Sequence, residues 1–152
     1  MNSMQVRQAS LAEAIIVLNQ ISEFDHPETE DSLKQRLAGH TSLILVAEHE
    51  DRLVGVKIGY CLSESTFYSW IGGVAPAGRR MGVAQALLDA QEAWAAEQGY
   101  QEIKVKSRNC FPSMLRLLMR NSYLIEDIEK KGNMTDYRIY FSKLLTKKKE
   151  SK

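Results

Sequence analysis

Cysteine, histidine and net charge are all scarce in this chain of 152 residues. Its two cysteines, Cys61 and Cys110, are too few for the disulfide framework of a small secreted domain, so we interpret both as reduced, buried thiols. The three histidines show no metal-site spacing, and no bound metal is expected. A formal net charge of +1 argues against a nucleic-acid protein that depends on a basic surface.

Long apolar runs are missing as well. No stretch approaches the roughly 20 residues that cross a bilayer, and the first residues lack the charged and apolar regions of a signal peptide. We therefore expect a cytoplasmic protein without a membrane partner. Hydrophobic residues make up 44% of the chain, which suits one globular domain over residues 1–145. The lysine-rich segment 146–152 is expected to be a disordered basic tail.

The order of predicted elements indicates an α/β domain with a mixed sheet. Apolar residues at helical spacing predict helices at residues 11 to about 24, 29–38, 83–98 and 112–121. Short β-prone segments predict strands at 4–8, 43–48, 53–60, 66–74, 102–107, 123–129 and 136–144. The first three strands after the second helix read as antiparallel neighbours. The helix between residues 74 and 102 implies a right-handed crossover and parallel pairing of the strands on either side of it.

Residues 74–84, with the sequence VAPAGRRMGVA, form the most informative segment. They lie between a predicted strand and a predicted helix, so they present unpaired backbone N–H groups at a helix start. The helix macrodipole adds partial positive charge there, and phosphate is the usual anion at such a site. Gly82 allows close approach of a ligand to the backbone. Arg79 and Arg80 would oppose the dipole unless an anion is bound.

Two other phosphate-binding motifs are excluded by the residues present. Gly73 and Gly78 have the spacing of a P-loop, but Arg79 and Arg80 follow in place of Lys and Ser or Thr. A Gly-x-Gly-x-x-Gly fingerprint of dinucleotide binding occurs nowhere in the chain.

The spacing Arg79-x-x-Gly82-x-Ala84 resembles the pyrophosphate-binding signature of the GNAT superfamily of N-acetyltransferases. The predicted order of elements is similar to that fold over roughly residues 4–145. The resemblance implies a GNAT acyl-CoA N-acyltransferase fold with about seven strands and four helices. It also implies acetyl-CoA as co-substrate, without a metal, and transfer of its acetyl group to a primary amine by direct attack in a ternary complex. Similar proteins often dimerise through their last strands or helices, so a homodimer is one state to test.

Several residues gain expected roles in acetyl-CoA binding from this resemblance. Backbone and side-chain groups of the loop and helix start would hold the pantetheine arm and the pyrophosphate, together with groups just after the fifth strand. The expected residues are Val74, Ala75, Arg79, Arg80, Met81, Gly82, Val83, Ala84, Asn109 and Ser113.

Catalytic groups are expected where the fourth strand ends. By resemblance, a splay or bulge there lets a backbone N–H of Gly72 or Gly73 face the thioester carbonyl; the alternative is that the glycines only terminate the strand. In the commoner family pattern a tyrosine protonates the leaving thiolate. Aligning Ser122-Tyr123 with the family's Gly-Phe places Leu118 at that position, and leucine cannot donate a proton.

This departure leaves three interpretations open. Another residue donates the proton, or the thiolate leaves unaided because a thiol pKa is near 8.5, or the chain is a non-catalytic acyl-CoA-binding module. A ribosome-directed acetyltransferase would need a more basic surface than a charge of +1 provides.

The acceptor side is expected to involve residues from several loops and one strand. Glu64, in the turn before the fourth strand, is a candidate general base. Asp25, His26 and Glu28 are further candidates for the base, and they lie in the loop between the first two helices, which lines the acceptor cleft in similar proteins. By strict alternation, Tyr68 and Trp70 share a strand face with Gly72, and they either wall the acceptor pocket or pack the core.

Overall fold

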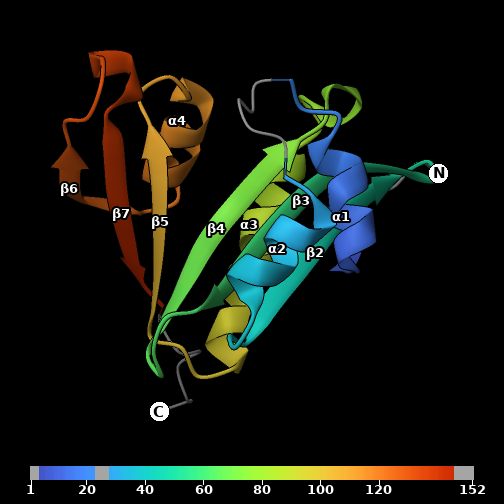
Figure 1. Ribbon diagram of the computed structural model, residues 1–152, viewed down its shortest axis with the longest axis horizontal. Coiled ribbons are helices and arrows are strands. Elements are labelled where there is room, and N and C mark those ends of the chain that lie inside the picture. The colour runs from blue at the N-terminus through green and yellow to red at the C-terminus, as the bar shows by residue number, and fades with distance from the viewer. Residues whose placement is uncertain (1–3, 23–27, 146–152) are drawn as a thin grey trace, which may run out of the picture.

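One seven-stranded mixed sheet with helices on both faces forms the fold (Figure 1). The computed structural model describes residues 4–22 and 28–145, so Asp25, His26 and the basic tail lie outside the described residues. The strand order is β1-β2-β3-β4-β5-β7-β6, with α1 and α2 on one face and α3 and α4 on the other. The predicted fold class is confirmed.

The element bounds follow the sequence patterns closely. The strands are β1 (Met4–Gln8), β2 (Ser42–His49), β3 (Arg52–Cys61), β4 (Thr66–Val74), β5 (Glu102–Arg108), β6 (Leu124–Glu129) and β7 (Arg138–Leu144). The helices are α1 (Leu11–Leu18), α2 (Glu30–Leu37), α3 (Val83–Glu97) and α4 (Pro112–Arg120), with 3-10 turns η1 (Pro76–Gly78) and η2 (Met134–Asp136). Neighbouring strands are antiparallel except β4 and β5, whose parallel pairing through α3 was predicted from the crossover.

The parallel strands β4 and β5 part halfway along their length. They pair only between Thr66–Ser69 and Glu102–Val105, and in Figure 1 they lie together at the bottom and far apart at the top. The separation coincides with a bulge at Trp70, because the register of β4 against β3 skips this residue. An extra residue bends and twists its strand, so β4 turns away with β3 while β5 stays with β7.

Two apolar layers cover the two sheet faces. The layer under α3 and α4 is built around Phe67, Leu87, Leu88 and Phe141, and the layer under α1 and α2 contains Val17 and Leu33. α3 packs against β3 at very short range, since a Cβ at Gly55 would lie 2.5 Å from Val83 Cγ1. This close approach fixes the start of α3 relative to the end of β4.

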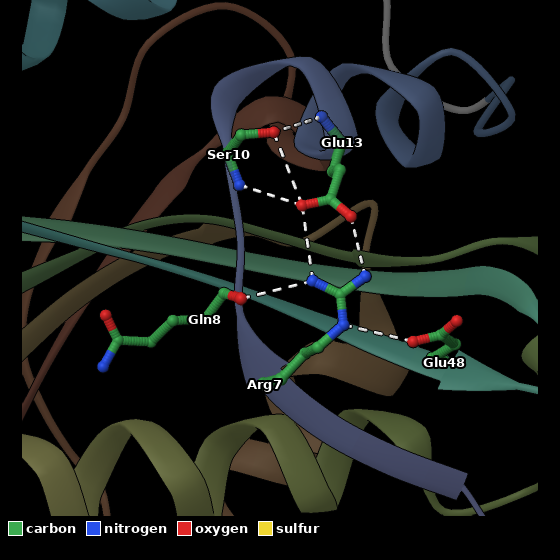
Figure 2. A network of polar contacts seen from close by, with 5 residues as sticks. All are labelled: Arg7, Gln8, Ser10, Glu13 and Glu48. Carbon is green, nitrogen blue, oxygen red and sulfur yellow. Dashed lines mark hydrogen bonds and ion pairs between the residues drawn. The ribbon is translucent and has the colours of Figure 1, made fainter.

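The N-terminal corner is held by the polar network that Figure 2 shows. Ser10 Oγ accepts a hydrogen bond from Glu13 N, while Glu13 Oε1 accepts one from Ser10 N, which is the predicted capping box of α1. The Arg7 guanidinium donates to Glu13 Oε2 at 2.7 Å and to Glu48 Oε1 at 3.1 Å. The Arg7 hydrogen bond is the main reason why the pKa of Glu13 is lowered to about 2.

Two expected boundaries are wrong. α1 ends at Leu18 and not near residues 23–25. Gln20 N donates to Val17 O and Ile21 N to Leu18 O, and these i→i−3 bonds tighten the chain into a turn that buries Ile21. The last strand starts at Arg138, two residues late, because η2 occupies the preceding residues.

The expectation that both thiols are buried is also wrong. Both cysteines are free, but Cys61 is half-buried at the end of β3 and Cys110 is exposed. Cys110 lies in the turn that connects β5 with α4, outside both elements, so neither core layer covers it.

Candidate functional site

The loop between β4 and α3 adopts a backbone suited to anion binding. Arg80 (φ 66°) and Gly82 (φ 77°) are both left-handed. Gly82 is the N-cap of α3 and contributes no side-chain cap. The first backbone bond of this helix start runs from Ala86 N to Gly82 O at 3.0 Å. The N–H groups of Val83 and Ala84 lie ahead of that bond, so they have no intrahelical acceptor.

Gly82 is required for its conformation more than for its size. A Cβ there would meet no described atom within 4 Å, so the space beside it is open. Its positive φ places the backbone in the left-handed region, where the conformational strain is largest for a β-branched side chain. From the sequence, the glycine is expected here because a ligand can approach it closely. The structure adds a second reason for glycine at this position, since only glycine adopts this turn without strain.

Positive charge surrounds this helix start. Arg79, Arg80 and Met81 are exposed, and Val83 is buried below them. Arg79 Nε donates to the carbonyl oxygen of Val74 at 3.2 Å, which ties the guanidinium to the end of β4. The cations add to the positive end of the helix dipole, and a bound anion would neutralise both.

The strand β4 brings the glycine pair to the opening of the sheet. In the register with β3, Gly72 lies opposite Lys57 and Gly73 opposite Val56. Beyond Ser69 the edge of β4 that faces β5 has no strand partner among the described residues. This edge is where a ligand arm can lie alongside a strand and reach backbone groups.

Lys57 is a site residue that sequence reasoning missed. Its side chain is 4% exposed, and its Nζ lies 3.4 Å from the position that a Gly72 Cβ would take. Burial lowers the pKa of Lys57 to about 8, against an opposing effect of the Glu92 carboxylate. The signal was a lysine within the otherwise apolar run Val54–Tyr60 of β3.

A cavity of about 250 Å³ lies beside the last paired residues of β4 and β5, just before the strands part. It is lined by Tyr60, Leu62, Tyr68, Lys104, Val105, Glu126, Tyr140 and Phe141. Arg36 of α2 stacks 4.7 Å from the centre of the Trp70 ring and donates to Tyr60 Oη at 3.2 Å. The cavity is thus rich in phenol groups, and its lining includes the ion pair of Lys104 and Glu126 at 2.7 Å.

Tyr68 and Trp70 share a strand face as predicted, but the prediction that Gly72 lies on the same face is wrong. Tyr68, Trp70 and Ile71 pack with the α1 and α2 layer, whereas Gly72 points toward Lys57 on the α3 side. The bulge at Trp70 adds one residue and reverses the alternation beyond it. Tyr68 lines the cavity, and Trp70 stacks on Arg36.

The other predicted residues are spread over both sides of the opening. Asn109 is exposed after β5, where its Nδ2 donates to Met134 O at 2.9 Å, and Ser113 is exposed in the first turn of α4. Ala75 is buried behind the loop. Glu64 is exposed in the turn between β3 and β4, about 20 Å along the strand from Gly72. The structure does not bring Glu64 to the glycine pair.

Leu118 is fully buried in the α3 and α4 layer, so no proton donor stands at its position. Ser122 adopts a left-handed backbone (φ 72°), as a residue aligned with glycine should. Tyr123 directs its hydroxyl to Glu92 Oε2 at 2.8 Å, and burial raises the pKa of this phenol.

Within residues 4–22 and 28–145, no group of three or more His, Cys, Asp and Glu side chains could hold a metal ion. Among these same residues, no helix combines the length and apolarity of a bilayer span.

Comparison with known proteins gives a consistent result. The sequence model described as the acetyltransferase (GNAT) family matches residues 10–120. Ard1 from Thermoplasma volcanium superposes with a TM-score of 0.81 at 17% identity, covering 94% of this chain and 98% of that one. The ribosomal-protein-S18-alanine N-acetyltransferase from Escherichia coli gives 0.81 at 12% identity, covering 97% of both chains.

A third structure is informative for its ligand. A GNAT family acetyltransferase from Elizabethkingia anophelis with acetyl-CoA bound superposes with a TM-score of 0.75 at 15% identity, covering 93% of this chain and 98% of that one. No match was found among curated proteins. At these identities the structural similarity establishes the fold, while the family match spans well over half of the chain. This chain belongs to the acetyltransferase (GNAT) family.

Proposed function

We propose that this protein transfers the acetyl group of acetyl-CoA to a primary amine by direct attack within a ternary complex. One observation carries the proposal: β4 and β5 part after Ser69, so Gly72 and Gly73 lie on the unpaired part of β4, and β4 leads directly into the anion-binding start of α3. A thioester held along β4 would therefore have its phosphates at the loop and its carbonyl near the glycine pair.

The loop has the chemistry that the diphosphate of acetyl-CoA requires. The N–H groups of Val83 and Ala84 and the exposed Arg79 and Arg80 would hold it, and hydrogen bonds to charged groups contribute about 1.5–3 kcal/mol each. Gly82, with open space beside it, would let the phosphates reach these donors. On the β5 side, Asn109 and Ser113 are accessible to the pantetheine arm.

The cavity on the opposite face suits the acceptor. An amine there would meet Tyr68 and its phenol neighbours, and its neutral form would attack the thioester carbonyl through the opening. A backbone N–H of Gly72 or Gly73 would stabilise the negative charge that develops on the carbonyl oxygen.

A second candidate is a non-catalytic acyl-CoA-binding module. The buried Leu118, at the place of the usual tyrosine acid, favours this alternative. The two functions differ in one respect that can be measured, because a binding module releases no thiol whatever amine is supplied.

Thiol release from acetyl-CoA, measured over a panel of amines, tests the proposal. The panel should hold free amino acids, polyamines, lysine peptides and a peptide beginning with alanine, since one structural neighbour is named as an alanine N-acetyltransferase. Both free thiols suit a reducing compartment, and we propose that the protein acts in the cytoplasm as a single domain over residues 1–145.

A further inference from the structure

Lys57 occupies an environment that a structural lysine rarely tolerates. It lies in the central strand β3 and is 4% exposed. None of the described residues forms a hydrogen bond or ion pair with its ammonium group. Lysine is almost never fully buried without a partner, because desolvating the charge is costly. Such a group is retained where its chemistry is used.

The ammonium group points to the reaction centre. Lys57 pairs with Gly72 in the sheet register, and the absence of a side chain at Gly72 leaves room for the lysine to cross β4. Its Nζ lies 3.4 Å and its Cγ 3.7 Å from the Gly72 Cβ position. The lysine therefore lies across the glycine and on the same sheet face as Leu118.

The helix above this lysine also carries unsatisfied polar atoms. In α3, Gln91 comes one helical turn after Leu87, which would contact a Cβ at Gly55, and directly before Glu92, whose carboxylate acts on Lys57. Gln91 is fully buried, and neither its Nε2 nor its Oε1 has a hydrogen-bond partner among the described residues. Buried polar atoms without partners are uncommon, and Gln91 supplies two of them on the face of α3 that covers the sheet.

The charged groups facing Lys57 leave its ammonium free to act. Glu92 of α3 is the charged group that influences it. That carboxylate already accepts a hydrogen bond from Tyr123 Oη at 2.8 Å and from Lys143 Nζ of β7 at 3.0 Å. Lys57 thus lies near a negative charge without being locked into an ion pair.

We infer that Lys57 is the proton donor to the departing coenzyme A thiolate, the role that Leu118 cannot fill. The inference rests on the proposed function. It makes Lys57 a catalytic residue that reaches the thioester sulfur from beneath Gly72. The usual tyrosine is replaced by a lysine from a different element on the same face of the sheet.

The proton and electron balance is complete with this assignment. The acceptor nitrogen forms the C–N bond and loses one proton to a base. The C–S bond breaks and its electron pair goes to sulfur, which takes one proton from the Lys57 ammonium. Neutral Lys57 then regains a proton from solvent. A donor pKa of about 8 matches a thiol whose ordinary pKa is near 8.5, so the transfer is nearly balanced in energy.

Titration of bound coenzyme A tests the inference without knowledge of the acceptor. The thiolate absorbance of coenzyme A is followed against pH in complex with the wild type, with Lys57→Met and with Lys130→Met. Lys130 is an exposed lysine beyond β6 and serves as the control. We expect the bound thiol in Lys57→Met to titrate about one pH unit or more above the wild type, because a cation beside a thiolate favours ionisation. Lys130→Met should match the wild type.

The amine that supports turnover in the wild type provides a second readout. Lys57→Met should lower kcat about 100-fold with an unchanged KM for acetyl-CoA. Unchanged thermal unfolding or a rise in its midpoint shows that the variant is folded. If coenzyme A binds both proteins and its thiol titrates alike in them, Lys57 is not the donor while acetyl-CoA binding stands. If the wild type does not bind coenzyme A, the proposed function itself fails.

Discussion

Gly82 and Gly99 lie at opposite ends of α3, and both hold a left-handed backbone with open space beside them. A valine at either position meets the same conformational strain, about 1–3 kcal/mol. Only Gly82 belongs to the proposed phosphate site. We predict that Gly82→Val weakens acetyl-CoA binding about 10-fold or more by calorimetry, whereas Gly99→Val loses stability and keeps its affinity. Equal affinity in the two variants would contradict the assignment of the loop.

Lys57 allows a prediction about stability and pH. Its pKa is about 8 in the folded chain and 10.5 in the unfolded chain, so the unfolded chain binds more protons between these values. The stability cost of the buried ammonium is therefore full below pH 8, about 3 kcal/mol, and disappears as the pH rises toward 10.5. Lys57→Met avoids this cost.

Denaturant unfolding at several pH values measures this effect. The stability advantage of Lys57→Met should be largest near pH 7 and should narrow as the pH approaches 10. Groups that titrate in both proteins cancel in the difference. An advantage that stays constant from pH 7 to 10 would show that the lysine is not buried as an ammonium group.

At the scale of single elements, helix starts were the most predictable feature. The capping box of Ser10 and Glu13 fixed the beginning of α1, and Pro112 marked the first turn of α4. The end of α1 could not be predicted, because the turn after Leu18 is stabilised by the burial of Ile21 in a tertiary layer. The bulge at Trp70 left no local trace either, since alternation in a sequence cannot reveal one unpaired residue.

The capping box gives a prediction for α1. Ser10→Ala removes the acceptor for Glu13 N and leaves the Arg7–Glu13 ion pair in place. We expect a loss of about 1 kcal/mol in unfolding free energy, which lowers the thermal midpoint by about 2–4 °C for a domain of this size. Ser65→Ala is the control, because Ser65 lies in a turn and caps no helix. An unchanged midpoint for Ser10→Ala would mean that the cap is not formed.

At the scale of the whole molecule, the sheet consists of two parts joined by four paired residues on each of β4 and β5. The helix α3 links the parts through the α3 and α4 layer. How much of the site the sequence could predict depends on whether its residues are contiguous in the chain. The phosphate loop is contiguous in the chain and was visible as a motif, whereas Lys57 meets Gly72 only through strand pairing.

A ligand between β4 and β5 would contact both parts and stabilise the molecule as a unit. Acetyl-CoA at 100 times its Kd should add about 2.7 kcal/mol, which raises the thermal midpoint by roughly 5–10 °C. Gly82→Val, with a Kd about 10-fold higher, should show about half of this increase or less at the same concentration. A thermal midpoint that stays unchanged at every acetyl-CoA concentration would argue against an acetyl-CoA site between β4 and β5.

The edge of the sheet formed by β6 is a candidate surface for dimer formation. β6 is an edge strand whose residues are all exposed, including Leu124, Ile125 and Ile128. Its other three residues are acidic, and an edge strand offers unpaired backbone groups to a second strand. The homodimer that the family resemblance implied would form most simply here. Light scattering should give twice the monomer mass, and Ile128→Lys should return it to that of one chain.

The most direct measurement of the central claim is acetyl-CoA turnover by thiol release over the amine panel, with the wild type beside Gly82→Val. We predict turnover with at least one class of primary amine in the wild type and its loss in the variant. Tight acetyl-CoA binding without turnover of any amine would contradict the claim and would identify the protein as an acyl-CoA-binding module.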